Sequence, residues 1–135
     1  MSPGPVLQYP TVRQYMTPSP CTVARNQPLS IAQRLMHERN IHHLPVLDGD
    51  QVVGILSQRD ILLVESFPGV NPTDLRVKEA MSPAPYQATA DAPLAEVVAT
   101  LLERRIGSAI IVEDERAIGV FTTNDALRAL ADLLA

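Results

Sequence analysis

The sequence contains an internal duplication, and this feature constrains the fold more than any other. Residues 54–60, GILSQRD, correspond to residues 119–125, GVFTTND, and each stretch closes with a hydroxyl residue and an aspartate three positions apart. Residues 12–62 align with residues 77–127 without a gap, and identical residues occur along the whole length. A repeat of this kind indicates one structural unit present twice. Each copy is too short to form a stable core alone, so we expect the two copies to pack on each other.

Composition restricts the class of protein. The chain has 135 residues, of which 46% are hydrophobic, and its formal net charge is −4. No apolar run approaches the roughly 18 residues of a membrane-spanning helix, and the amino terminus has neither the basic nor the apolar region of a secretion signal. The acidic balance argues against non-specific nucleic-acid binding, which depends on neutralising phosphates. We therefore expect a cytoplasmic globular protein that binds neither membrane nor nucleic acid.

The periodicity of the apolar residues predicts the same elements in both copies. We expect an extended arm at residues 1–11, the first repeat at 12–65, a linker at 66–74 and the second repeat at 75–135. In each repeat a short helical turn and an extended piece precede an amphipathic helix, two β-branched strands and a second helix. Each copy is thus predicted to be a β-α-β-β-α unit, and the fold class is mixed α and β (α/β or α+β).

Helix ends and surface residues refine this prediction. Asn26 is the candidate N-cap of the first long helix, and Asp91 is the candidate N-cap of its equivalent in the second copy. The last helix carries Leu127, Leu130 and Leu134. It therefore has more apolar residues than the core of one repeat needs. An exposed apolar helix face indicates an interface, so we expect a homodimer.

Several motifs together resemble a tandem pair of cystathionine β-synthase (CBS) domains, the arrangement called a Bateman module. They are MTP at residues 16–18, MSP at 81–83, IHHLPV at 41–46 and the two Gly…Ser/Thr-x-x-Asp segments. The resemblance covers nearly the whole chain. It implies two repeats packed sheet to sheet about a pseudo-twofold axis, with two clefts that commonly hold adenine nucleotides or S-adenosylmethionine. It also implies a sensing function rather than catalysis.

Asp60 and Asp125 are the candidate readers of a ribose. One carboxylate can accept hydrogen bonds from both vicinal hydroxyls of a ribose, which suits a fixed aspartate to this role. Ser57 and Thr122 lie at predicted helix starts, where free N–H groups and the helix dipole favour a phosphate. The resemblance therefore implies a nucleoside-type ligand at each motif.

The resemblance implies two sets of ligand-binding residues. For the Asp60 site they are Thr17, Cys21, Thr22, Ile41, His42, His43, Leu44, Pro45, Ser57, Arg59 and Asp60. For the Asp125 site they are Tyr86, Gln87, Ile106, Gly107, Ser108, Ala109, Ile110, Thr122, Asn124 and Asp125, together with His42 and His43 of the first copy. The implied ligand is AMP, ADP, ATP or S-adenosylmethionine, and no cofactor is required.

The two copies differ before their second long strand, where His42-His43 corresponds to Gly107-Ser108. Family geometry would place His43 near the phosphates of a ligand at Asp125, whereas Ser108 offers the Asp60 site no cation. Arg59, close to the first motif, could add charge. We therefore expect the Asp125 site to take the more phosphorylated ligand and to bind it more weakly at pH 8 than at pH 6.

An alternative interpretation of the motif stays open. Ser/Thr-x-x-Asp is close to a capping box, in which the hydroxyl and the acid bind only the N–H groups of their own helix. The alternative function is then a ligand-free interaction or scaffold module of the same fold.

Other chemistry has less support. His37, His42 and His43 lack the spacing of a metal site, and Cys21 has no activating partner in the sequence. We therefore expect neither a metal nor enzymatic activity. The output of such a module would go to a separate effector protein.

Overall fold

The computed structural model describes residues 9–135, so most of the predicted arm lies outside the described residues. The first copy contains the 3₁₀ turn η1 (Val12–Gln14), strands β1 (Thr17–Pro18) and β2 (Val23–Ala24), helix α1 (Leu29–Arg39), strands β3 (His43–Asp48) and β4 (Gln51–Ser57), and helix α2 (Gln58–Glu65). The predicted order of elements is present in this copy.

The second copy repeats that order after a short 3₁₀ turn in the predicted linker, η2 (Pro72–Asp74). Its elements are α3 (Val77–Ala80), β5 (Ser82–Pro83), β6 (Gln87–Thr89), α4 (Leu94–Arg104), β7 (Ser108–Glu113), β8 (Arg116–Thr122) and α5 (Thr123–Leu133). The mixed α and β fold class is confirmed.

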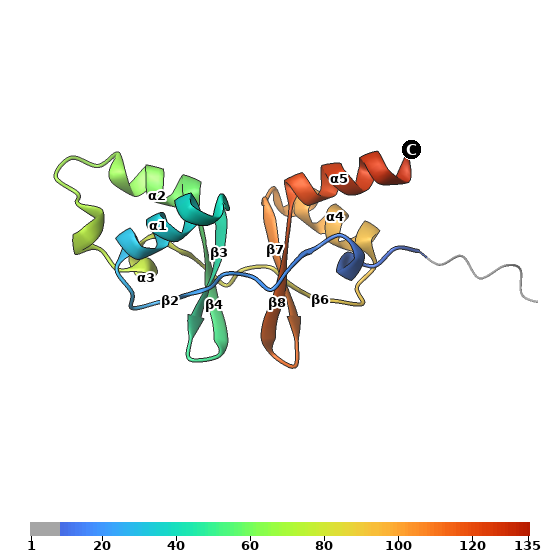
Figure 1. Ribbon diagram of the computed structural model, residues 1–135, viewed down its shortest axis with the longest axis horizontal. Helices are drawn as coiled ribbons and strands as arrows, with labels where there is room; N and C mark the ends of the chain where they lie inside the picture. The colour runs from blue at the N-terminus through green and yellow to red at the C-terminus, as the bar shows by residue number, and fades with distance from the viewer. Residues whose placement is uncertain (1–8) are drawn as a thin grey trace, which may run out of the picture.

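The two sheets stand side by side at the centre of the molecule. One sheet has the order β2-β3-β4-β5 and the other β1-β8-β7-β6. Figure 1 shows the hairpins β3–β4 and β7–β8 next to each other, with α1 and α2 on one flank and α4 and α5 on the other. The copies are thus packed sheet to sheet about a pseudo-twofold axis, as the resemblance implied.

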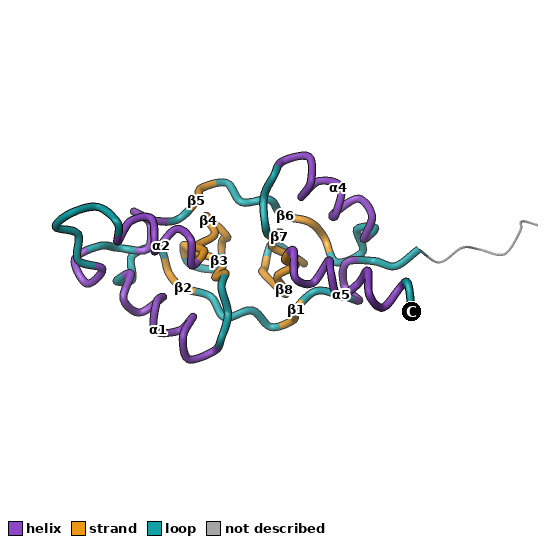
Figure 2. Tube along the Cα trace, turned by 90° about the horizontal axis from the view of Figure 1, so that it is seen from above, coloured by secondary structure: helices purple, strands orange, loops and turns teal. Residues whose placement is uncertain are grey.

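The first strand of each copy belongs to the sheet of the other copy. β1 pairs antiparallel with β8, and β5 pairs antiparallel with β4. In Figure 2 the chain passes from one half to the other at β1 and again at β5. Each copy still contains the predicted β-α-β-β-α unit, which is β2-α1-β3-β4-α2 in the first copy and β6-α4-β7-β8-α5 in the second. The exchanged strands β1 and β5 precede these units and were not predicted, because pairing between strands far apart in the sequence leaves no mark on local periodicity.

The exchange extends to the hydrophobic cores. Val12, from the start of the first copy, is fully buried in the core of the second half, together with Val97 and Phe121. Val77, from the start of the second copy, is fully buried in the core of the first half. Each core is therefore incomplete without a segment from the other copy.

Backbone groups of the exchanged segments also cap the two long helices. Leu29 N–H at the start of α1 donates to the carbonyl of Leu75 at 2.8 Å, and Leu94 N–H at the start of α4 donates to the carbonyl of Pro10 at 2.9 Å. The predicted N-caps Asn26 and Asp91 were wrong. The N-cap residues are prolines, and a main-chain carbonyl from elsewhere takes the place of a capping side chain.

The glycines of the duplicated motif allow the crossing strands to approach closely. A Cβ at Gly119 would lie 2.5 Å from Met16 Sδ and 3.1 Å from the carbonyl oxygen of Thr17 on β1. A Cβ at Gly54 would lie 2.5 Å from Met81 Sδ and 3.0 Å from the carbonyl oxygen of Ser82. The paired methionine and glycine of each copy thus form one crossing, and this contact explains why both recur in the repeat.

The last helix has the exposed apolar face that the sequence predicted. Leu127, Leu130 and Leu134 are 60%, 53% and 75% exposed, and Leu102 on α4 is 75% exposed. Over residues 9–135, no helix combines the length and the apolar character needed to cross a membrane.

We expect Gly119→Ala and Gly54→Ala each to lower the free energy of unfolding by about 1–3 kcal/mol, because the added methyl overpacks the crossing. Denaturant unfolding measures this loss. Gly107→Ala is the control, since a Cβ there meets no heavy atom closer than 3.8 Å. Equal stability of all three variants would show that the crossings are loosely packed.

Candidate functional site

Two clefts flank the pair of central sheets, and each contains one motif aspartate. We call them the Asp125 cleft, with a volume of about 800 Å³, and the Asp60 cleft, with a volume of about 690 Å³. The Asp125 cleft is lined by Thr17, Ser19, Pro20, Cys21, Arg39, Asn40, Ile41, His42, His43, Gly107, Val120, Thr122, Thr123, Asn124, Asp125 and Arg128. The Asp60 cleft is lined by His42, His43, Ile55, Ser57, Gln58, Arg59, Asp60, Leu62, Ser82, Pro83, Ala84, Pro85, Tyr86, Arg104, Ile106, Gly107 and Ser108. Both copies contribute to both clefts.

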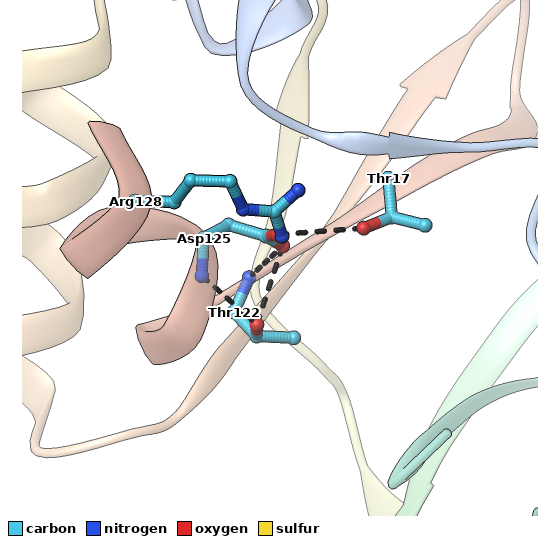
Figure 3. A network of polar contacts seen from close by, with 4 residues as sticks. All are labelled: Thr17, Thr122, Asp125 and Arg128. Atoms are coloured by element: carbon cyan, nitrogen blue, oxygen red, sulfur yellow. Dashed lines mark hydrogen bonds and ion pairs between the residues drawn. The ribbon is translucent and has the colours of Figure 1, made fainter. Parts of the chain in front are cut away.

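Asp125 is held by contacts on both of its carboxylate oxygens. Its Oδ2 accepts from the backbone N–H of Thr122 at 2.9 Å and from the hydroxyl of Thr122 at 3.2 Å. Its Oδ1 accepts from the hydroxyl of Thr17 at 3.4 Å and forms an ion pair with Arg128. Figure 3 shows Arg128 and Thr17 reaching this carboxylate from different elements, α5 and β1. These contacts stabilise a carboxylate that is only 2% exposed.

Asp60 makes the same contacts with its own helix but fewer others. Its Oδ2 accepts from the backbone N–H of Ser57 at 2.8 Å, and its N–H donates to the hydroxyl of Ser57 at 3.1 Å. Within residues 9–135, no further hydrogen bond or ion pair to this carboxylate is found. Leu63 occupies the position that corresponds to Arg128. The two carboxylates therefore differ in how much of their acceptor capacity is free.

The capping interpretation of the motif is correct for the contacts that each motif makes with its own helix. Both Ser57 and Thr122 form reciprocal capping boxes with their aspartates. A carboxylate offers about four acceptor positions, and the capping contacts use only Oδ2. The other oxygen, Oδ1, has no contact at Asp60 within residues 9–135, whereas at Asp125 it is contacted by Thr17 and Arg128. Capping and ligand binding are compatible at these residues.

Some predicted site residues line the cleft opposite to the expected one. Thr17, Cys21 and Ile41 were assigned to the Asp60 site but line the Asp125 cleft. The reason is the strand exchange: β1 pairs with β8, next to Asp125, and carries the residues that follow it to the same cleft.

Three predicted residues of the second copy also line the opposite cleft. Tyr86, Ile106 and Ser108 were assigned to the Asp125 site but line the Asp60 cleft. Six of the predicted residues line neither cleft. Four of them, Leu44, Pro45, Ala109 and Ile110, are fully buried in the sheets, and the other two are Thr22 and Gln87. The remaining predicted residues line the cleft to which they were assigned. They are Ser57, Arg59 and Asp60 in one cleft, Thr122, Asn124 and Asp125 in the other, and Gly107, His42 and His43 in both.

The histidine pair lies between the clefts and lines both of them. The pair is therefore no closer to one cleft than to the other by this criterion. It gives no reason to expect that the Asp125 cleft binds phosphate better than the Asp60 cleft. Burial lowers the pKa of His43 below its ordinary value of 6.5, and the nearby His42 lowers it further. Asp60 and Asp125 act in the opposite direction on this pKa. His43 is therefore mainly neutral at pH 7.

Sequence reasoning missed three arginines of the clefts. Arg39 lines the Asp125 cleft, and Arg104, at the same position of the second copy, lines the Asp60 cleft. The guanidinium of Arg104 stacks over the ring of Tyr86, 5.0 Å from its centroid. Ser108 brings no cation to the Asp60 cleft, but Arg104 of the second copy does.

Two signals in the sequence could have identified these arginines. Arg39 and Arg104 are identical residues at the same position of the repeat. Arg128 lies three residues after Asp125, the spacing at which side chains on one helix meet. In the described part of the chain, no group of three or more histidine, cysteine or acidic residues comes together as a metal site would require.

Comparisons with known proteins agree with this architecture. The family model for the CBS domain matches residues 12–66 and 77–132. Hypoxic response protein 1 of Mycobacterium tuberculosis (strain CDC 1551 / Oshkosh) is 26% identical over 123 residues, which cover 90% of this chain and 86% of that protein.

Solved structures of similar chains include complexes with adenosine derivatives. CBSX2 in complex with AMP superposes with a TM-score of 0.80 and 25% identity, covering 95% of this chain and all of that one. The CBS domain pair of protein MJ0100 in complex with 5′-methylthioadenosine and S-adenosyl-L-methionine has a TM-score of 0.84, with 93% of this chain and 99% of that one covered. Its identity of 23% makes this second likeness one of fold alone.

We expect the free energy of unfolding to fall as the pH is lowered from 6.5 toward the depressed pKa of His43 in the folded protein. In this window the unfolded chain binds a proton at His43 that the folded chain does not, so protonation favours unfolding. Above pH 6.5 both states are neutral and the effect vanishes. Urea unfolding between pH 5 and 7.5 measures it.

His43→Gln should flatten this pH dependence, whereas His37→Gln, an exposed residue of α1, should leave it unchanged. An unaltered slope in His43→Gln would show that another group causes the loss of stability.

Proposed function

Because the chain belongs to the CBS domain family, we propose that it is a regulatory CBS pair that binds adenine-containing ligands in its two clefts and signals their presence to a partner. The observation that carries this proposal is the placement of each motif aspartate. Each lies at a helix N-terminus, inside a cleft built by both copies and lined by arginine and histidine. This arrangement offers an acceptor for a ribose diol and cations for a phosphate.

The similar structures support an adenosine-type ligand. CBSX2 binds AMP, and the MJ0100 pair binds 5′-methylthioadenosine and S-adenosyl-L-methionine. These ligands share an adenosine part and differ in the charge at the 5′ position. Both clefts here have volumes in the range of small-molecule sites. We propose that this chain takes AMP, ADP, ATP or S-adenosylmethionine, with Asp60 and Asp125 as the residues that bind the ribose.

The function proposed here is recognition, with no chemical step. Cys21 lines the Asp125 cleft and is partly buried, and no hydrogen bond from its thiol to a base is found within residues 9–135. Binding in a cleft shared by two copies can alter how they pack, and a partner that contacts both copies can detect this.

A homodimer is the proposed assembly. An apolar groove of about 760 Å³ runs along α4 and α5, and we call it the α4–α5 groove. Its exposed leucines are Leu102, Leu127, Leu130 and Leu133. An apolar surface of this extent is characteristic of protein interfaces.

The scaffold function is the second candidate, and the same α4–α5 groove favours it. Both capping boxes are complete without a ligand, so the fold does not require one. In this alternative the groove recruits other proteins and the clefts have no role.

We expect AMP, ADP, ATP or S-adenosylmethionine to raise the melting temperature of the wild-type protein in a thermal-shift panel. A ligand at 100 times its Kd stabilises the folded state by about 2.7 kcal/mol, which corresponds to a shift of roughly several degrees for a chain of this size. Asp60→Ala and Asp125→Ala should each reduce the shift, because each removes one ribose acceptor.

Asp50→Ala is the matched control, since Asp50 is exposed in the turn between β3 and β4. If no ligand shifts the wild-type protein, the scaffold function is favoured. If the shift persists in both cleft variants, the ligand binds elsewhere.

We expect Leu130→Glu to convert the dimer to a monomer, because it places a charge in the middle of the α4–α5 groove. Light scattering after size exclusion measures the mass. Arg116→Glu, at the tip of the β7–β8 hairpin, is the control and should remain dimeric. A wild-type protein that is monomeric at all concentrations would contradict the proposed assembly.

A further inference from the structure

Asp125 has no free acceptor position in this structure. Its four contacts come from the backbone N–H of Thr122, the hydroxyl of Thr122, the hydroxyl of Thr17 and the guanidinium of Arg128. A carboxylate offers about four acceptor positions. A ribose diol that binds Asp125 brings two new donors, so it must displace contacts that are already present.

Arg128 is the contact most open to displacement toward a ligand. The two Thr122 contacts belong to the capping box that starts α5, and losing them would leave backbone N–H groups unpaired. The side chain of Arg128 is 64% exposed and lines the cleft next to Asp125. Its flexible stem allows the guanidinium to turn from the carboxylate toward the cleft.

The Asp60 cleft lacks this arrangement. Leu63 replaces the arginine, so a ribose diol can approach the free oxygen of Asp60 without displacing a cation. The arginines of that cleft are placed otherwise: Arg104 stacks on Tyr86, and Arg59 makes no ion pair within residues 9–135. The two clefts therefore differ in whether ribose binding frees a guanidinium.

We propose that Arg128 makes the Asp125 cleft selective for adenosine ligands that carry a 5′ phosphate over those that lack one. The inference rests on the proposed function, since it concerns the same cleft and the same class of ligand. The ribose diol takes the places of the guanidinium and of the Thr17 hydroxyl on Asp125 Oδ1, and the released guanidinium binds the phosphate. A ligand without a phosphate breaks the ion pair and gives Arg128 no new partner.

This exchange keeps the guanidinium of Arg128 paired with an anion. With AMP bound, Asp125 keeps its hydrogen bonds through the ribose, and Arg128 exchanges a carboxylate for a phosphate, for which the guanidinium has matching geometry. With adenosine or 5′-methylthioadenosine bound, the guanidinium leaves the carboxylate in the same way but gains no phosphate. The loss of the ion pair is therefore uncompensated only when the ligand has no phosphate.

Isothermal titration calorimetry with AMP and adenosine in an Asp60→Ala background measures the selectivity of the Asp125 cleft by itself. We expect Arg128→Leu, which installs the residue of the first copy, to weaken AMP binding by roughly tenfold to a hundredfold, the range for a lost charged hydrogen bond. Adenosine binding should be unchanged or stronger. Arg128→Lys should retain part of the selectivity, and Arg116→Leu, which removes an equal charge far from the clefts, should retain all of it.

Circular dichroism shows whether Arg128→Leu is folded. If it is not, Arg128→Gln replaces it, because the amide can still donate to Asp125 but carries no charge for a phosphate. A ratio of AMP to adenosine affinity that stays the same in the Arg128 variants overturns the inference. An equal loss for both ligands overturns it too, since it would mean that Arg128 only supports the carboxylate.

Two further outcomes separate this inference from the proposed function. If the Asp60→Ala protein binds neither ligand while the wild-type protein binds AMP, the inference fails, and the proposed function holds for the Asp60 cleft alone. If the wild-type protein binds no adenosine ligand in the thermal-shift panel, the proposed function fails together with it.

Discussion

The exchange of first strands between the two copies is the contact on which the rest of the structure depends. β1 crosses to β8 and β5 crosses to β4, and a methionine packs on a glycine at each crossing. The same segments complete the hydrophobic cores and supply the backbone carbonyls that cap α1 and α4. Neither half can fold with its own residues alone, which explains how two units of this size form a stable protein.

This exchange also forms the clefts. Each motif aspartate starts a helix of one copy, and the chain segment that faces it arrives from the other copy through the crossing. A molecule bound in either cleft therefore contacts both copies. A ligand that prefers one relative position of the copies shifts the equilibrium toward it, which is the physical requirement for a sensor without catalysis.

The two copies differ in the side chains that line the clefts. His42 and His43 have no equivalent in the second copy, yet they lie so centrally that both clefts share them. The difference between the clefts comes instead from Arg128, whose counterpart Leu63 cannot pair with Asp60. The Arg128 ion pair and the Thr17 hydrogen bond thus distinguish two carboxylates that the motif alone presents as equal.

The sequence by itself determined the duplication, the order and approximate bounds of the elements, and the two capping boxes, because each depends on local periodicity or on residues three positions apart. The tertiary structure alone decided which copy contributes to which cleft. Thr17, Cys21 and Tyr86 were therefore assigned to the wrong clefts, since strand pairing across the pseudo-twofold axis is not encoded in local periodicity. Arg104 shows the same limit, because its stacking on Tyr86 depends on the distance between a helix end and a strand that only the packed fold sets.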